Sequence, residues 1–142
     1  MSKLTTLISR GKILESLHGI KCLIGSINGK TIFSTNNEND IIYPRSSIKI
    51  FQGIPFSTSN AVELYNLNKK QIALSCSSHC GEDFHIKELN NWLEKINLKI
   101  SDLKCGIHNP LHQQSSNNLF LSGRQPDQIY NNCAGKHLAM LT

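Results

Sequence analysis

The sequence Pro44-Arg45-Ser46-Ser47-Ile48-Lys49 decides how the chain is organised. Pro44 disfavours a helix that continues from the residue before it, and a proline suits the entry to a new helix. A helix that starts just after Pro44 places Ser46 and Lys49 three residues apart on one face. A serine becomes a nucleophile when a neighbour takes its proton, and a lysine amine can do so when burial lowers its pKa. The motif therefore predicts a Ser46–Lys49 pair near a helix N-terminus, whose positive potential favours a developing alkoxide.

The same Ser-x-x-Lys spacing occurs again at Ser101-Asp102-Leu103-Lys104. The ordinary interpretation of this second copy is a helix cap followed by a solvated lysine, and capping stays open as an interpretation of Ser46 as well. The first copy differs in its apolar flank, which consists of Ile50, Phe51 and Ile54. We expect this flank to remove water from around Lys49, because a lysine surrounded by water stays protonated and cannot act as a base.

Length and composition describe a folded soluble protein. The chain has 142 residues, of which 39% are hydrophobic and 18% charged, enough for one domain with a core. The formal charge of +5 comes mostly from scattered lysines, with only three arginines. Because no Lys/Arg cluster alternates with aromatic residues, we expect no nucleic-acid partner. No stretch approaches the ~20 apolar residues of a membrane span, so we expect no membrane partner either.

The five cysteines point to a reducing compartment. Their number is odd, their spacing is irregular, and the first ten residues lack the apolar core of an export signal. We therefore expect a cytoplasmic protein with reduced thiols, in which each cysteine is core filler or a ligand.

Local patterns predict several elements of secondary structure. Residues 22–27 and 31–34 read as two strands joined at Asn28-Gly29, a strong hairpin signal. Residues 82–96 carry apolar residues at helical spacing, and Trp92 among them is expected in the core. Residues 58–66 look like a short helix, and the helix after Lys49 is expected to be interrupted at Gly53 and Pro55.

The polar stretch 105–125 is expected to be a loop. Pro126 is expected to open a short helical segment that ends at Tyr130. Two Cys–His pairs, Cys105-x-x-His108 and Cys133-x-x-x-His137, could form a Cys2His2 zinc site. Core cysteines and loop histidines are the favoured alternative, because pairs with such spacing arise by chance. Cys133 stands out, since it precedes a glycine-containing helix start that would stabilise a thiolate.

Three separated segments, taken together, resemble one family. They are Pro44 to Lys49, Cys76-Ser77-Ser78-His79-Cys80-Gly81-Glu82 and Asn131-Asn132-Cys133-Ala134-Gly135-Lys136-His137. The set is similar to the signature segments of the L-asparaginase II family, the thermolabile, rhizobial-type serine asparaginases. The pieces Arg10-Gly11, Glu15-Ser16 and Cys105-Gly106 also fit its pattern and order. Cys80 departs from the asparagine that often follows the Ser-His pair, a change that we expect to be tolerated.

The resemblance implies an α/β (α+β) fold like that of serine β-lactamases and glutaminases, in which helices pack around a sheet. It also implies an amidohydrolase that converts L-asparagine to L-aspartate and ammonia. Ser46 matches the nucleophile, Lys49 matches its partner, and Ser78 matches a second serine in the hydrogen-bond network. Arg45 and His137 match residues near the charged groups of the substrate.

Zinc is the cofactor that the resemblance implies. Cys133 and Lys136 match two zinc ligands of the family, and a lysine ligand must be a neutral amine, a state that the metal itself would enforce. The zinc is expected to shape the substrate site rather than to activate water.

Family members are longer, and their further zinc-binding cysteine and second catalytic lysine would lie beyond Thr142. We therefore expect residues 1–142 to form a single, incomplete domain, the N-terminal portion of an asparaginase domain, with exposed apolar surface and sheet edge. One alternative is a penicillin-recognising acyl-serine hydrolase, which shares the Ser-x-x-Lys pair but is disfavoured because no Ser-Asp-Asn or Lys-Thr-Gly triplet occurs. Another is a non-catalytic remnant that binds zinc or a partner. A homodimer is a candidate assembly, and asparagine and glutamine both stay open as substrates.

Overall fold

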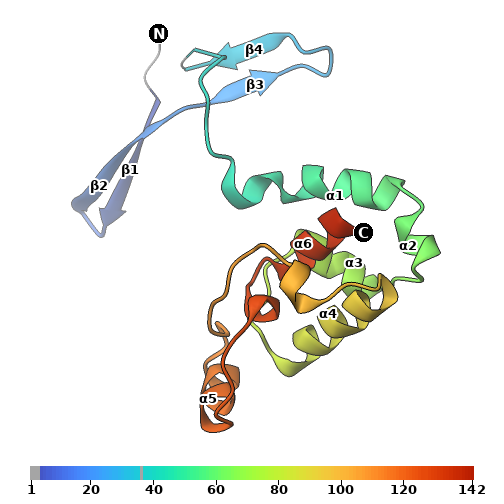
Figure 1. Ribbon diagram of the computed structural model, residues 1–142. Helices are drawn as coiled ribbons and strands as arrows, with labels where there is room; N and C mark the ends of the chain where they lie inside the picture. Colours follow the sequence, from blue (N-terminus) through green and yellow to red (C-terminus); the bar gives the residue numbers. More distant parts are fainter. Residues whose placement is uncertain (1–3, 36) are drawn as a thin grey trace. The chain divides into compact units, whose positions relative to one another are not determined.

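The computed structural model describes residues 4–35 and 37–142 (Figure 1). The chain divides into two compact units, Met1–Tyr43 and Pro44–Thr142. We call the first the N-terminal unit and the second the helical unit. Helices and small antiparallel sheets occur together, which confirms the expected α/β (α+β) class. The expectations that the whole chain is one domain and that helices pack around a sheet stay predictions.

The N-terminal unit consists of two antiparallel hairpins. Strands β1 (Leu4–Arg10) and β2 (Ile13–Ile20) form the first, and β3 (Leu23–Gly25) and β4 (Thr31–Ser34) form the second. The second hairpin confirms the prediction from Asn28-Gly29, and its turn places Gly29 at a φ of 77°, where a side chain would be strained.

The first hairpin leaves apolar surface exposed, as expected. Leu7 pairs with Leu17 across the strands, and the two side chains are 63% and 62% exposed. A two-stranded hairpin has little capacity to bury such residues by itself.

The helical unit contains all the helices of the described residues. They are the 3-10 helices η1 (Arg45–Ile48), η2 (Ile100–Asp102) and η3 (Gln128–Tyr130), and the α-helices α1 (Lys49–Thr58), α2 (Ala61–Leu64), α3 (Lys69–Cys76), α4 (Asp83–Lys95), α5 (Gln113–Leu121) and α6 (Ala134–Leu141). None of these helices is long and apolar enough to cross a membrane.

Two expected helices are confirmed, and two other expectations about helices are wrong. Helix α4 confirms the prediction for residues 82–96, and η3 lies in the segment expected after Pro126. The expected interruption of α1 is wrong, because the helix continues through Gly53 and Pro55 to Thr58. The helix expected at 58–66 is consequently reduced to α2.

The polar loop expected at 105–125 contains helix α5, so that expectation is wrong in part. Its side-chain amides pair one turn apart, Gln113 with Asn117 at 2.9 Å and Gln114 with Asn118 at 2.8 Å. His112 caps the first turn by accepting the Ser115 N–H. Amide pairs at i,i+4 stabilise a helix without an apolar stripe, which is why hydrophobic periodicity does not reveal it.

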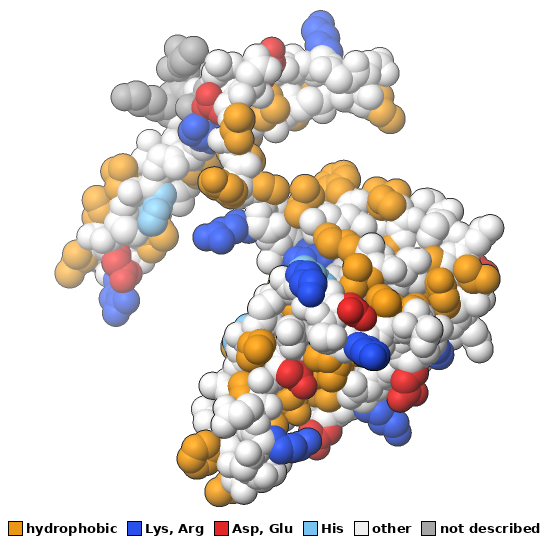
Figure 2. All heavy atoms as spheres, in the orientation of Figure 1, with side chains coloured by type: hydrophobic (Ala, Val, Ile, Leu, Met, Phe, Trp, Pro, Cys, Tyr) orange, Lys and Arg blue, Asp and Glu red, His pale blue; other side chains and the backbone are white. Residues whose placement is uncertain are grey.

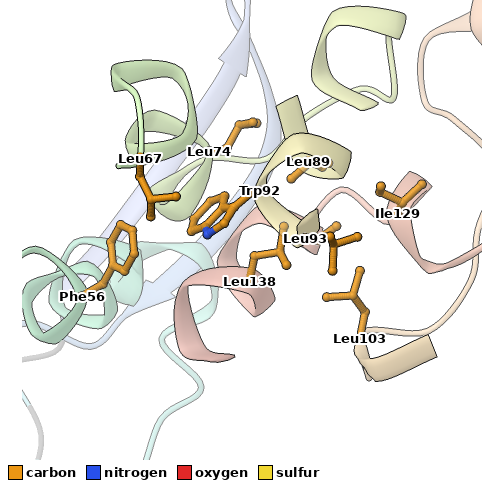
Figure 3. Close-up of a cluster of buried hydrophobic side chains, with 10 residues drawn as sticks. Phe56, Leu67, Leu74, Leu89, Trp92, Leu93, Leu103, Ile129 and Leu138 are labelled. Carbon is orange, nitrogen blue, oxygen red and sulfur yellow. The ribbon is translucent and has the colours of Figure 1, made fainter. Parts of the chain in front are cut away.

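The core of the helical unit is centred on Trp92 (Figure 3). Its side chain is fully buried, as expected, and its ring lies 5.5 Å from that of Phe56, which comes from α1. The indole N–H donates to Thr142 Oγ1 at 3.1 Å, so the polar atom of this large apolar residue is satisfied. Leu89 and Leu138 pack in the same cluster and are also fully buried.

Helices α1 and α6 both approach α3 closely, and glycine makes each approach feasible. A Cβ at Gly53 of α1 would lie 2.4 Å from Cys76 Sγ, and a Cβ at Gly135 of α6 would lie 2.6 Å from the Leu74 carbonyl oxygen. A larger residue at Gly135 therefore meets the α3 backbone and forces the helices apart, whereas a larger residue at Gly53 forces the Cys76 side chain or the helix to shift. Because α3 leads directly into Ser78, these two contacts set the positions of the elements that carry the candidate site residues.

Candidate functional site

Lys49 is the first residue of α1, and its side chain is buried. It shares the buried face of the helix with Gly53 and Phe56, at positions i, i+4 and i+7. Only 8% of Lys49 is exposed, and its Nζ donates a hydrogen bond of 2.6 Å to Ser78 Oγ. A lysine amine next to a serine hydroxyl away from water is an arrangement suited to proton transfer.

The apolar flank of Lys49 has a different role from the one expected. Ile50, Phe51 and Ile54 are 73%, 68% and 48% exposed, so they do not shield the amine. They lie on the outer side of α1, where Figure 2 shows apolar side chains along the surface of this helix. Lys49 loses its water because its own face of α1 packs against α3.

Ser46 lies in η1 and is exposed. Its carbonyl accepts the Lys49 N–H, and its hydroxyl makes no hydrogen bond within residues 4–35 and 37–142. The structure thus joins Lys49 to Ser78, and the predicted Ser46–Lys49 contact stays a prediction. Arg45, the neighbour of Ser46, is exposed and has a φ of 53°, in the region that residues other than glycine seldom adopt.

The second Ser-x-x-Lys copy shows what the spacing does without burial. Lys104 is exposed, as expected, and its Nζ donates to the Ser101 carbonyl at 3.0 Å rather than to a hydroxyl. The N-terminus of η2 is capped by Asp102, which accepts the Lys99 N–H, so the expected serine cap is wrong. Burial of the lysine, and not the spacing, distinguishes the two copies.

Ser78 lies in the turn between α3 and α4, as the sequence suggested. Gly81 closes this turn at a φ of 79°, and the neighbouring Cys80 carbonyl accepts the His112 N–H at 2.8 Å. The His79 N–H donates to the Asn132 carbonyl at 3.2 Å. The turn with Ser78 is therefore held directly against the segment that precedes α6.

Cys133, Lys136 and His137 gather at the first turn of α6. Cys133 is the N-cap residue, and its N–H donates to Asn131 Oδ1 at 2.9 Å. Lys136 and His137 follow within the first turn and are half-buried. Burial lowers the pKa of His137, and the nearby Lys136 charge lowers it further, so its imidazole is neutral at pH 7.

A model of the L-asparaginase II family matches residues 7–142, nearly the whole chain. The chain belongs to the L-asparaginase II family. The comparison with curated proteins gave no match. At the level of the family, the protein is an asparaginase-like amidohydrolase. The family match extends over both units and over all three signature segments.

Within this L-asparaginase II chain, Cys133 and Lys136 fit zinc as two donors. They lie three residues apart on one helix face, and a thiolate and a neutral amine are both ligands that zinc accepts. Burial raises the pKa of the Cys105 thiol, and the charge of Cys133 raises it further. The described residues contain no group of three or more His, Cys, Asp or Glu side chains placed to hold a metal. The Cys2His2 alternative therefore finds no support.

Two histidines of this site have roles that the sequence did not predict. His79 is 2% exposed, and His108 Nε2 accepts the Asn132 N–H at 3.1 Å. Burial, His85 and His108 lower the pKa of His79 to about 4, although the Asn131 carbonyl opposes this effect. His79 lies in a signature segment, which was the available signal, but no spacing indicates that its ring is buried.

Proposed function

We propose that this protein hydrolyses L-asparagine to L-aspartate and ammonia through a serine acyl-enzyme. The observation that carries the proposal is the buried Lys49 amine, 2.6 Å from the Ser78 hydroxyl. Lysine is seldom buried in proteins, and a buried lysine hydrogen-bonded to a serine can supply the base that an acyl-serine reaction requires. Membership of the L-asparaginase II family supports the substrate class.

In the proposed reaction, Ser46 Oγ attacks the side-chain amide carbon of asparagine. The Ser46 proton passes to the Lys49 amine, and from there to the departing nitrogen, which leaves as ammonia. Water then attacks the aspartyl ester, gives up a proton to Lys49, and releases aspartate as Ser46 recovers its proton. Ser78 relays protons, because its hydroxyl can accept from Lys49 and donate onward.

Arg45 and His137 are proposed to bind the charged groups of the substrate. A guanidinium matches a carboxylate in two parallel hydrogen bonds, so we assign Arg45 to a carboxylate of asparagine. The neutral His137 ring can donate or accept one hydrogen bond at the same group or at the amine.

Cys133 and Lys136 are proposed to hold a zinc ion that shapes the substrate site. Cysteine sulfur is a common zinc ligand, and Cys133 lies at the start of α6. The five cysteines are free thiols, which supports a cytoplasmic location. We propose a homodimer as the assembly.

The second Ser-x-x-Lys copy provides a matched control for the experiment. Lys49→Met and Lys104→Met remove the same group from the same spacing, one buried and one exposed. Ammonia release from L-asparagine by the 142-residue chain should fall about 100-fold or more in Lys49→Met and stay unchanged in Lys104→Met. Equal activity of the two variants would refute Lys49 as the base. A chain that releases no ammonia, or that is acylated by a fluorescent penicillin, would favour the alternatives.

A further inference from the structure

The imidazole of His79 is buried within the helical unit, and the reaction proposed above gives it no role. Its Nδ1 accepts the Gly81 N–H at 3.2 Å. An accepting nitrogen carries no proton in a neutral imidazole, so the proton lies on Nε2. The ring therefore fixes the turn that follows Ser78 through one specific tautomer.

The other ring nitrogen is unusual. His79 Nε2 is buried and has no partner at hydrogen-bond geometry among the described residues, although the Asn131 carbonyl is close enough to raise the pKa of the ring. A buried polar group that forgoes a hydrogen bond destabilises a protein. Such groups concentrate where function requires them.

The peptide of Asn132 is held from both sides by histidines. Its carbonyl accepts the backbone N–H of His79 at 3.2 Å, so the turn that the His79 ring holds through Gly81 sets the position of this donor, and the Asn132 N–H donates to His108 Nε2 at 3.1 Å. His108 Nδ1 lies 2.7 Å from the Asn109 carbonyl, which places the proton of that ring on Nδ1.

A second contact joins the same two segments further along the chain. Gly135 of α6 packs against the Leu74 backbone of α3, at a distance that leaves no space for a Cβ. Helix α3 ends shortly before Ser78, and α6 begins directly after Cys133. The Ser78 turn and the start of α6 are therefore joined at two levels.

We propose that His79 is a positioning residue that couples the Ser78 turn to the start of α6, so that Ser78 and the Cys133–Lys136 pair move as one unit. The part that concerns turnover and metal rests on the proposed function. The coupling between the two segments is a property of the fold, and it can be measured without substrate turnover and without bound metal.

Three variants test the coupling. His79→Leu removes the acceptor for the Gly81 N–H, whereas His79→Asn places an amide oxygen near the position of Nδ1. His18→Asn is the control, an exposed histidine in the N-terminal unit. Each full-length variant is tested for the rate of Cys133 alkylation by iodoacetamide, for Co²⁺ affinity from thiolate-to-metal absorption, and for kcat and KM with L-asparagine.

His79→Leu should lower the Co²⁺ affinity 10–100-fold, the effect usual for residues that orient metal ligands, and should change the alkylation rate by a similar factor. It should lower kcat more than it raises KM, and His79→Asn should restore most of each loss. A folded His79→Leu with unchanged alkylation and unchanged Co²⁺ affinity would overturn the proposal. If no variant releases ammonia, the proposed function fails for this chain, and the alkylation rates still decide the coupling.

Hydrogen exchange of the unaltered chain gives a test that needs no folded variant. The amides of His79, Gly81 and Asn132 should open with the same free energy if the two segments move together. Exchange of Asn132 at a clearly lower free energy than His79 would show that the segments open independently and would overturn the proposal.

Discussion

The contact between α1 and α3 can be tested with one substitution, Gly53→Ala. Its effect on the free energy of unfolding should be destabilising in the natural sequence and stabilising when Cys76 is replaced. Replacing Gly53 by alanine places a Cβ 2.4 Å from Cys76 Sγ, about 1 Å closer than ordinary van der Waals contact. Overpacking of this kind destabilises a protein by about 1–3 kcal/mol. Alanine in place of glycine inside a helix stabilises it by about 1 kcal/mol. Gly53→Ala alone should therefore lower the free energy of unfolding by about 1 kcal/mol.

Removing the sulfur should reverse this effect. In a Cys76→Ala background the clash is absent, so Gly53→Ala should raise the free energy of unfolding by about 1 kcal/mol. The coupling between the two sites is then about 2 kcal/mol, measured as a double-mutant cycle in urea with helical circular dichroism as the probe. If Gly53→Ala has the same effect in both backgrounds, α1 and α3 do not meet through this contact, and the placement of Lys49 beside Ser78 loses its support.

Three further predictions concern stability. Because the folded state holds His79 at a pKa of about 4 against 6.5 when exposed, the unfolded chain takes up a proton first as the pH falls. Stability should therefore be intact above pH 6.5 and decline by about 2–3 kcal/mol between pH 6.5 and 4; His79→Asn should flatten this decline in urea titrations at several pH values. Trp92→Ala should lower the free energy of unfolding by about 3–5 kcal/mol, and an unchanged urea midpoint would contradict its place at the centre of the core. Asn97 ends α4 at a φ of 55°, so Asn97→Gly should preserve or slightly raise the melting temperature while Asn97→Ala should lower it by a few degrees.

Short sequence patterns predicted the elements that are specified by a single local feature, such as a turn dipeptide or an apolar helix face. The Asn28-Gly29 turn predicted the second hairpin, and the apolar periodicity around Trp92 predicted α4. Helix α5 could not be found in this way, because amide pairs such as Gln113–Asn117 stabilise it and leave no apolar stripe. The first hairpin was missed because its turn at Gly11 lacks a strong two-residue signal.

The candidate site was predictable as a set of residues but not as a set of contacts. The motifs identified Lys49, Ser78 and Cys133, but their mutual distances depend on how α1, α3 and α6 pack. The Ser-x-x-Lys spacing pointed to Ser46 as the partner of Lys49, whereas the buried face of α1 directs the amine to Ser78. The role of His79 follows from burial, and burial of a polar side chain in a turn has no periodic signature.

The central claim is that Ser46 carries the acyl group, with the buried Lys49 as its base. Its most direct test is mass spectrometry of the 142-residue chain after rapid acid quenching of turnover with L-asparagine. An aspartyl adduct should be found on the peptide that contains Ser46, and fragmentation should distinguish Ser46 from Ser47. Ammonia release with no adduct, or with an adduct on Ser78 or on a residue remote from Lys49, would contradict the account.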